Sequence, residues 1–281
     1  MKLKYYFILL SILLIGIVCI AGCTSSTSTP AATPTPQIVY VTVLVTQTPA
    51  SQPSLQTTSG SAEIPTANPT EQLAYTTDQI NKHFIDVAFS SDYQNVVRWS
   101  ALVVKDSVTG AYTPNDEMII SNISQQFNEY STTTQLPSKP TEGIEGNIVI
   151  NFLPTSSLQT LTADVSYNSV NQKQVINKDA SGTVASIYRV TGPTWTVYIN
   201  SDLTGDERTH YIVRGLLYTL GFVGQTGTYP DSIFYSAPNT ITTPNIIDWD
   251  VIQLMYGNKI SAGMNLTDVE NILLIINKNP T

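Results

Sequence analysis

Histidine and cysteine are almost absent from this chain of 281 residues, which contains two of each. A catalytic zinc ion needs about three protein ligands and a general base for its bound water. The two histidines, His83 and His210, cannot form a three-histidine site, and together with Cys19 and Cys23 they do not have the spacing of a zinc finger. Cys19 and Cys23 both lie near the N-terminus, before the part of the chain that is expected to fold. The folded part is therefore expected to have no disulfide, and its stability should depend on its packed core.

Charged residues are also scarce, at 12% of the chain, and acidic residues outnumber basic ones by 21 to 13. The formal net charge is -8, and it becomes -10 if Lys2 and Lys4 are removed with an N-terminal signal. Proteins that bind a polyanion are normally basic, so nucleic acid is not expected as a partner. The sequence contains no internal repeat and no glycine-rich phosphate loop, and we expect no cofactor.

Residues 1–23 have the form of an export signal. Lys2 and Lys4 precede the apolar run YYFILLSILLIGIVCIAG, and the segment IAGC has the pattern of a lipobox. We therefore expect lipid attachment at Cys23. The alternative is an uncleaved membrane span, because the run is close to the lower limit of about 17 apolar residues. Both interpretations predict the membrane as a partner and a folded domain outside the cytoplasm.

Residues 24–70 are rich in Thr, Ser and Pro and carry almost no charge. Such a composition buries too little apolar surface to offset chain entropy, which predicts a disordered tether. The alternating stretch IVYVTVLV from Ile38 to Val45 resembles a strand, but its isolation between prolines favours a linker segment. The folded domain is expected over residues 71–281.

The segment TGDERTHYIVRGLLYTLGF, residues 204–222, organises this domain. Thr204 and Glu207 have the spacing of a capping box, which predicts a helix that starts near Gly205. Gly221 is expected to end the helix in a left-handed conformation. Apolar residues at helical spacing predict a buried face, formed by Ile212, Leu216, Leu217 and Leu220.

A second face of this helix carries His210, Arg214 and Tyr218 at four-residue steps, and we call these three residues the polar ridge. We expect the candidate site here. The following loop and helix should bring acidic residues over it, namely Asp231, Asp248 and Asp250. Arg214 is expected to pair with one of these aspartates, either to tie the segments together or as part of a binding site.

Three further helices are predicted from apolar residues at helical spacing. They lie in EQLAYTTDQINKHFIDVAF, from Pro114 to Tyr130, and in VENILLIINK near the C-terminus. Thr267 and Glu270 have capping-box spacing for the last of them. His83 lies beside the apolar face of the first helix and is expected to be a structural or surface residue.

Strands are predicted in ALVVKD, in NIVINFLP and in a hairpin between Ser181 and Asn200. The polar segment from Ser156 to Lys178 has no clear pattern and is left unassigned. Helices and strands in this order predict an α+β domain, with a mixed sheet packed with helices.

Three polar positions remain to be interpreted. Asn122-Ile-Ser and Asn265-Leu-Thr match the N-glycosylation sequon, although Asn122 lies on a predicted helix. No histidine is placed next to Ser232 by the sequence, so Ser232 is expected to cap a turn rather than act as a nucleophile.

The order of helix, glycine turn, loop and helix resembles metzincin-type zinc peptidases. Their motif, HExxHxxGxxH, precedes a turn containing Met and a short helix ending in a segment such as LYG. On that pattern Arg214, Gly215 and Tyr218 take the places of the first His, the catalytic Glu and the second His. Gly224 takes the place of the third His, and Phe234 in SIFY that of Met. The spacing is kept, but every chemical position is replaced.

A longer resemblance covers residues 76–264. The segments that carry it are NKHFIDVAFSSDY, RWSALVVKD, NIVINFLP, LGFVGQTGTYPDSIFY and DWDVIQLMYGNKISAGM. They look like landmark segments of a family of exported proteins of unknown function. That family is regarded as zincin-like, and its members often lack an intact metal motif. The resemblance implies a degenerate zincin-like fold, in which NIVINFLP is expected to be the edge strand next to the ridge helix.

Three functions are compatible with these features. The favoured one is a membrane-tethered, catalytically inactive zincin-like domain that binds surface proteins or glycans. The second is a hydrolase with an altered site, which would use His210 as its base and perhaps Asp248. The third is a structural envelope protein. Fold alone does not choose between them.

Overall fold

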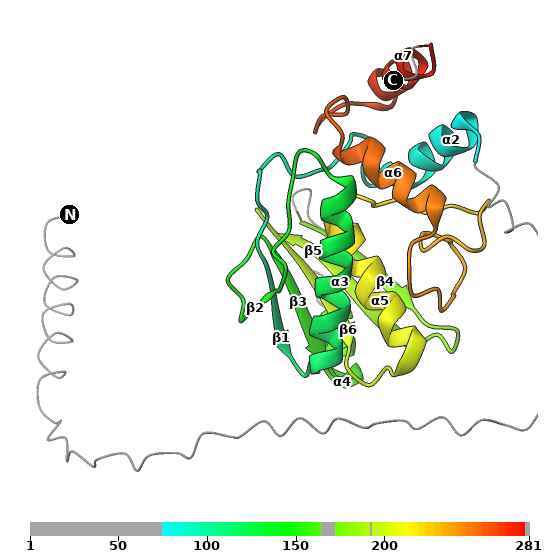
Figure 1. Cartoon of the computed structure of the whole chain (residues 1–281). Coiled ribbons are helices and arrows are strands. Elements are labelled where there is room, and N and C mark those ends of the chain that lie inside the picture. Colours follow the sequence, from blue (N-terminus) through cyan, green and yellow to red (C-terminus); the bar gives the residue numbers. More distant parts are fainter. Residues whose placement is uncertain (1–74, 164–171, 192, 279–281) are drawn as a thin grey trace, which may run out of the picture. The chain divides into compact units, whose positions relative to one another are not determined.

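A computed structural model describes residues 75–163, 172–191 and 193–278 of the chain (Figure 1). The expected export signal, the lipidation residue Cys23 and the expected tether all lie outside the described residues. In the described part, no helix is long and apolar enough to cross a membrane.

The described part is an α+β domain with one six-stranded sheet, as the sequence predicts. The helices are α2 (Thr77–Ala88), α3 (Pro114–Tyr130), α4 (Thr155–Thr162), α5 (Gly205–Thr219), α6 (Ile246–Tyr256) and α7 (Leu266–Lys278). The strands are β1 (Asp106–Gly110), β2 (Thr141–Glu142), β3 (Ile148–Leu153), β4 (Gln172–Lys178), β5 (Val184–Thr191) and β6 (Thr194–Asn200).

The sheet is mixed, with the strand order β2-β1-β3-β6-β5-β4. The pairs β1–β2, β1–β3 and β3–β6 are parallel, whereas β5 is antiparallel to both β6 and β4. The predicted hairpin between Ser181 and Asn200 is therefore confirmed as β5 and β6.

Helices cover both faces of the sheet. α3 and α5 lie side by side across one face (Figure 1). On the opposite face, α4 inserts Leu158 against Val184 and Ile187 of β5. Because side chains alternate along a strand, Tyr188 points the other way, towards α5. α6 packs against α2 and α3 beyond the sheet.

Two strand predictions are wrong in their placement. The strand predicted in ALVVKD begins later, because β1 runs from Asp106 to Gly110. NIVINFLP forms β3, which is an interior strand between β1 and β6 and not an edge strand. The edge strand beside α5 is instead β4, which lies in the segment from Ser156 to Lys178 for which we made no prediction. Its polar side chains obscured it, since an edge strand need not be apolar.

The N-terminal capping of two helices also differs from the prediction. α5 does begin at Gly205, but the Thr204 side chain makes no capping hydrogen bond. The last helix is capped by Asn265, two residues earlier than the predicted Thr267. There the Asp268 N–H donates to Asn265 Oδ1 at 3.0 Å, and the Asn265 N–H donates to Asp268 Oδ2 at 3.1 Å.

Gly221 ends the ridge helix as predicted. Its φ is +98°, its N–H donates to the Tyr218 carbonyl at 3.0 Å, and the Phe222 N–H donates to the Leu217 carbonyl at 3.2 Å. These two bonds form a Schellman motif. A Cβ at Gly221 would lie 1.6 Å from the Val97 carbonyl oxygen, so both the conformation and the packing require glycine.

Replacement of Gly221 by alanine should therefore lower the free energy of unfolding by about 3 kcal/mol or more. Backbone strain at a positive φ costs on the order of 1–3 kcal/mol, and the overlap with Val97 adds to it. Gly182→Ala is the matched control, because Gly182 also has a positive φ, +85°, but a Cβ added there would meet nothing within 4 Å. Urea unfolding measures both variants, and equal losses would show that the packing at Gly221 is not limiting.

Candidate functional site

The polar ridge of α5 faces two adjoining cavities, which we call the cleft. The first has a volume of about 170 Å³ and is lined by His210 and Arg214. The second, of about 330 Å³, is lined by Arg214 and Tyr218. The walls that the cavities share are Asn177, Tyr188, Arg214 and Gln225. The structure thus places the three ridge residues along one cleft, as their spacing predicts.

Strand β4 forms a wall of this cleft. Val175 lines the second cavity, Ile176 and Lys178 line the first, and Asn177 lines both. The Tyr211 hydroxyl on α5 donates to the Lys178 carbonyl at 3.1 Å, which joins β4 to the ridge helix. The cleft therefore lies between the helix and the edge of the sheet.

Arg214 is buried, with 7% of its surface exposed. Its guanidinium donates to the carbonyl oxygens of Phe222, at 3.0 Å, and Gly224, at 2.7 Å, and lies 5.1 Å from the centre of the Phe234 ring. The predicted pair with an aspartate is wrong: in the described part, Arg214 forms no ion pair. Burial lowers the pKa of the guanidinium from its usual value, but arginine starts so high that it remains a cation.

Close packing accounts for glycine at two positions of the zinc-peptidase pattern. A Cβ at Gly215 would lie 2.7 Å from Val197 Cγ1, because α5 packs tightly on β6. A Cβ at Gly224 would lie 2.2 Å from the carbonyl oxygens of both Asp86 and Phe89. In this packing, no glutamate fits at the first position and no histidine at the second.

His210 is held as a neutral side chain. Its Nδ1–H donates to the Ile241 carbonyl at 2.7 Å, and a carbonyl can only accept, so this nitrogen carries a proton. Burial lowers the pKa of the imidazole to about 4; the hydrogen bond to Ile241 opposes this shift, and the charge of Arg214 adds to it. At neutral pH Nε2 therefore carries a lone pair, but a base with so low a pKa is weak.

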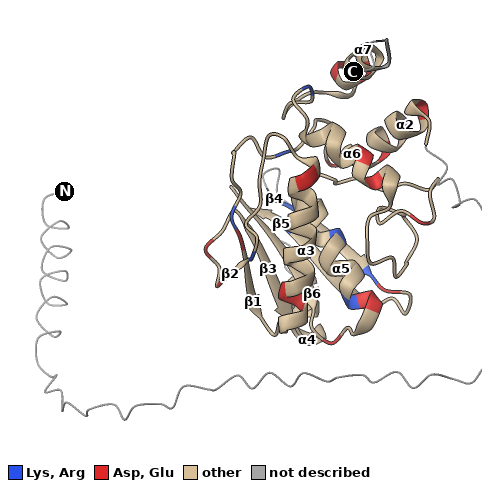
Figure 2. Cartoon of the chain, in the orientation of Figure 1, with Lys and Arg blue, Asp and Glu red and all other residues tan. Residues whose placement is uncertain are grey.

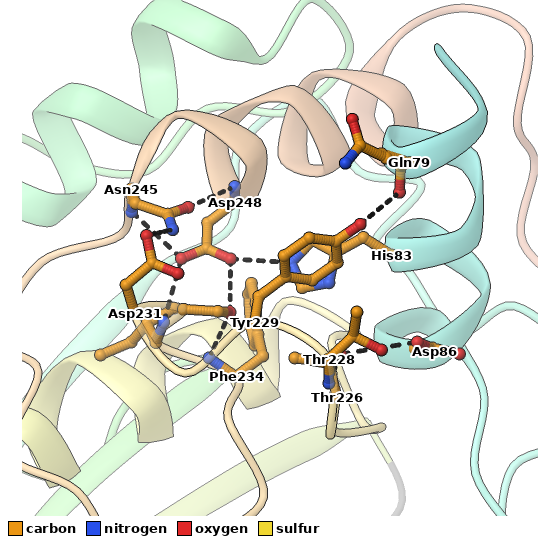
Figure 3. A network of polar contacts seen from close by, with 12 residues as sticks. Gln79, His83, Asp86, Thr226, Thr228, Tyr229, Asp231, Phe234, Asn245 and Asp248 are labelled. Atoms are coloured by element: carbon orange, nitrogen blue, oxygen red, sulfur yellow. Dashed lines mark hydrogen bonds and ion pairs between the residues drawn. The ribbon is translucent and has the colours of Figure 1, made fainter. Parts of the chain in front are cut away.

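A second cluster of polar residues lies behind the cleft, centred on the buried Asp248 carboxylate (Figure 3). Its Oδ1 accepts hydrogen bonds from Ser232 Oγ at 2.6 Å and from His83 Nε2 at 2.8 Å. Its Oδ2 accepts from the backbone N–H groups of Ile233 and Asn245, both at 3.0 Å. These four bonds join α2, the loop before α6 and the first turn of α6, and we call this arrangement the Asp248 cluster.

The Asp248 cluster is not a nucleophilic triad. In such a triad a histidine lies between the serine and the carboxylate, whereas here Ser232 and His83 both bond to Asp248. Ser232 Oγ also accepts from the Phe234 N–H at 3.0 Å, which is the bond of the turn-capping serine that the sequence predicts. All three side chains are fully buried. The geometry therefore supports a structural role.

Of the three aspartates predicted to lie over the ridge, Asp250 lines neither cavity, and Asp231 and Asp248 belong to the Asp248 cluster and its margin. Asp248 has four donors around its carboxylate, so no lone pair is left for a ligand. Asp231 Oδ2 accepts from Asn245 Nδ2 at 3.0 Å. Neither residue lines the cleft. In the described residues, no group of three or more His, Cys, Asp or Glu side chains could hold a metal ion.

Sequence reasoning allowed a structural role for His83, but it missed the partner of His83 and did not single out Tyr188. His83 is fully buried, and its partner Asp248 is 165 positions away. Tyr188 is buried in the cleft wall and was not singled out, because its strand reads as ordinary core. The capping-box spacing of Asn245 and Asp248 was the available signal for the cluster.

The sequons occupy different settings. Asn122 is exposed on α3. Asn265 is also exposed, and its side-chain oxygen caps α7. Basic residues are few and lie apart along the ribbon (Figure 2).

Comparison with protein families gives one match. The family described as "Protein of unknown function (DUF2927)" matches residues 77–274, which is more than half of the chain. No curated protein matches the sequence.

Asp248→Asn should lower the free energy of unfolding by about 2–4 kcal/mol, because an amide NH₂ would face hydrogen-bond donors in either orientation and leave buried groups unpaired. Asp250→Asn is the control on the same helix. Burial raises the pKa of the Asp250 carboxyl, so loss of its charge should be neutral or slightly stabilising. Urea unfolding compares them, and a similar loss in both variants would show that the cluster does not hold α6 in place.

Proposed function

We propose that this chain, which belongs to the DUF2927 family, is a membrane-tethered, extracytoplasmic binding module built on a zincin-like domain without catalytic activity. The observation that carries the proposal is the cleft beside α5, in which Arg214 stands where the zinc-peptidase pattern has its first histidine.

The arrangement of elements supports the zincin-like part of the proposal. α5, the left-handed Gly221, the loop with Phe234 and then α6 follow one another in the order of the metzincin pattern. The motif positions Arg214 and Tyr218 line a single cleft beside a mixed sheet.

Three features favour binding over catalysis. Gly215 replaces the general base and has no room for a larger side chain. Arg214 is a fixed cation, which repels a metal ion. His210 has a pKa of about 4, which makes it a poor general base at neutral pH. A cleft with buried polar walls can nevertheless bind a ligand without transforming it.

The membrane anchor in this proposal is inferred from the sequence alone. A basic start, an apolar run and IAGC before Thr24 are the features of a lipidated export signal. The runner-up is a span that is never cleaved.

Cys23→Ser distinguishes the two anchors. If Cys23 carries the lipid, the variant should lose incorporation of radiolabelled fatty acid and accumulate with an unprocessed signal. Cys19→Ser is the matched control and should leave labelling unchanged, because Cys19 precedes the expected cleavage point. Full labelling of Cys23→Ser would refute lipidation at this residue.

Binding can be tested with the full-length protein in detergent, used to capture cell-surface proteins and glycans. Arg214→Lys and Tyr218→Phe should reduce retention of the captured ligand severalfold, whereas Lys259→Met, at an exposed position that does not line the cleft, should not. Retention that survives both cleft substitutions would place binding elsewhere. Zinc bound in stoichiometric amount, with peptide cleavage abolished by His210→Ala, would instead establish a hydrolase.

A further inference from the structure

Arg214 has hydrogen-bonding capacity that the described residues do not use. The guanidinium has five N–H donors, and its hydrogen-bond partners in the described part are the carbonyl oxygens of Phe222 and Gly224. Both acceptors are neutral, and no carboxylate among these residues lies within ion-pair distance of the guanidinium; the Asp248 carboxylate acts on it only at longer range. A buried cation without a counter-ion is costly, and an anion that enters the cleft would relieve that cost.

The Tyr188 hydroxyl is a second unsatisfied group in the same wall. Tyr188 is 2% exposed, and in the described part no hydrogen bond of its hydroxyl meets the usual distance and angle limits, although the nearby Ser186 side chain opposes the rise in its pKa that burial causes. Buried hydroxyl groups are normally paired, and each exception calls for an explanation. Tyr188 lines both cavities together with Arg214. One ligand could therefore reach both groups.

The chemistry around these groups selects an anion of low charge. Arg214 can only donate, and the Tyr188 hydroxyl can donate to the same ligand atom or its neighbour. The exposed Lys178 lines the first cavity, whereas the acidic Asp86 and Asp92 line the second. A negative group is thus favoured on the side of the first cavity. The planar fork of arginine matches the two oxygens of a carboxylate.

The position of the cleft favours a peptide as the source of that carboxylate. Both cavities run along β4, which is the edge strand of the sheet among the described residues. Edge strands present main-chain donors and acceptors to an extended chain. The side-chain amides of Asn177 and Gln225, which line both cavities, add polar groups suited to a peptide backbone.

We propose that the cleft binds a carboxylate group of a peptide, with the Arg214 guanidinium as counter-ion and the Tyr188 hydroxyl as a second donor. This inference rests on the proposed binding function. The carboxylate can come from a peptide C-terminus or from an acidic side chain, and both sources offer the same pair of oxygens.

Calorimetric titration of the full-length protein in detergent tests the inference with three probes. These are N-acetyl-tetra-alanine with a free C-terminus, the same peptide as its C-terminal amide, and the amide with aspartate at its third position. At least one carboxylate probe should bind about tenfold more tightly than the neutral amide, because hydrogen bonds to a charged group are about twice as strong as neutral ones. Tighter binding of the first probe would identify a peptide C-terminus as the source of the carboxylate, and tighter binding of the third probe would identify an acidic side chain.

Two tyrosine variants give a control that separates binding from folding. Tyr188→Phe should weaken carboxylate binding by about fivefold through the loss of one hydrogen bond, without lowering the melting temperature. Tyr130→Phe removes a hydroxyl on α3, and Tyr130 lines neither cavity, so affinity should not change. Arg214→Lys keeps the charge and should still lose affinity, because it loses the fork.

The outcomes are distinct. Equal affinity for the acid and amide probes, insensitive to Tyr188→Phe, would overturn the carboxylate inference and leave a binding cleft of another specificity. Failure of all three probes to bind saturably would also overturn it, while the capture experiment above still judges the proposed function. A preference for the carboxylate that is reduced in Tyr188→Phe but not in Tyr130→Phe would support it.

Discussion

The buried carboxylate of Asp248 determines how the segments behind the cleft are held together. It accepts hydrogen bonds from a side chain on α2, from a side chain and a main-chain N–H of the loop, and from the main chain at the start of α6. A buried charge is tolerated only when its hydrogen-bonding capacity is filled. Because His83, Ser232 and Asp248 must all meet, the loop that bears Phe234 has little freedom, and Phe234 is placed against Arg214.

The ridge helix is held by a different constraint, which is close contact between backbones. Gly215 lets α5 approach β6, and Gly221 and Gly224 let the chain after the helix pass against neighbouring carbonyl groups. Arg214 then donates to the carbonyls of Phe222 and Gly224 and fastens this turn to its own helix. The positions where a zinc peptidase would carry its ligands and base therefore serve packing in this domain. The same packing leaves Arg214 and the Tyr188 hydroxyl facing the cleft, and this is the basis for the functional proposals.

Part of the fold and of the site could be predicted because the relevant signals are local. Helical spacing located α3 and α5, alternation located the β5–β6 hairpin, and four-residue steps placed His210, Arg214 and Tyr218 on one ridge. The predictions failed where a partner lay far along the chain. Arg214 was expected to pair with an aspartate because charge complementarity is visible in a sequence, but backbone carbonyls that turn towards it are not. β3 was assigned to the edge because its residues do not reveal which strands flank it.

The sequence by itself determined most element types and the glycine that ends the ridge helix, since these depend on residue identity and short spacing. Only the tertiary structure decided that Asp248 bonds to His83 across 165 positions, that β4 forms the edge beside α5, and that Tyr188 and Arg214 share a cleft. The physical reason is that strand order and buried hydrogen bonds are settled by the packing of the whole core, in which each polar group takes the partner that the surrounding elements bring within reach.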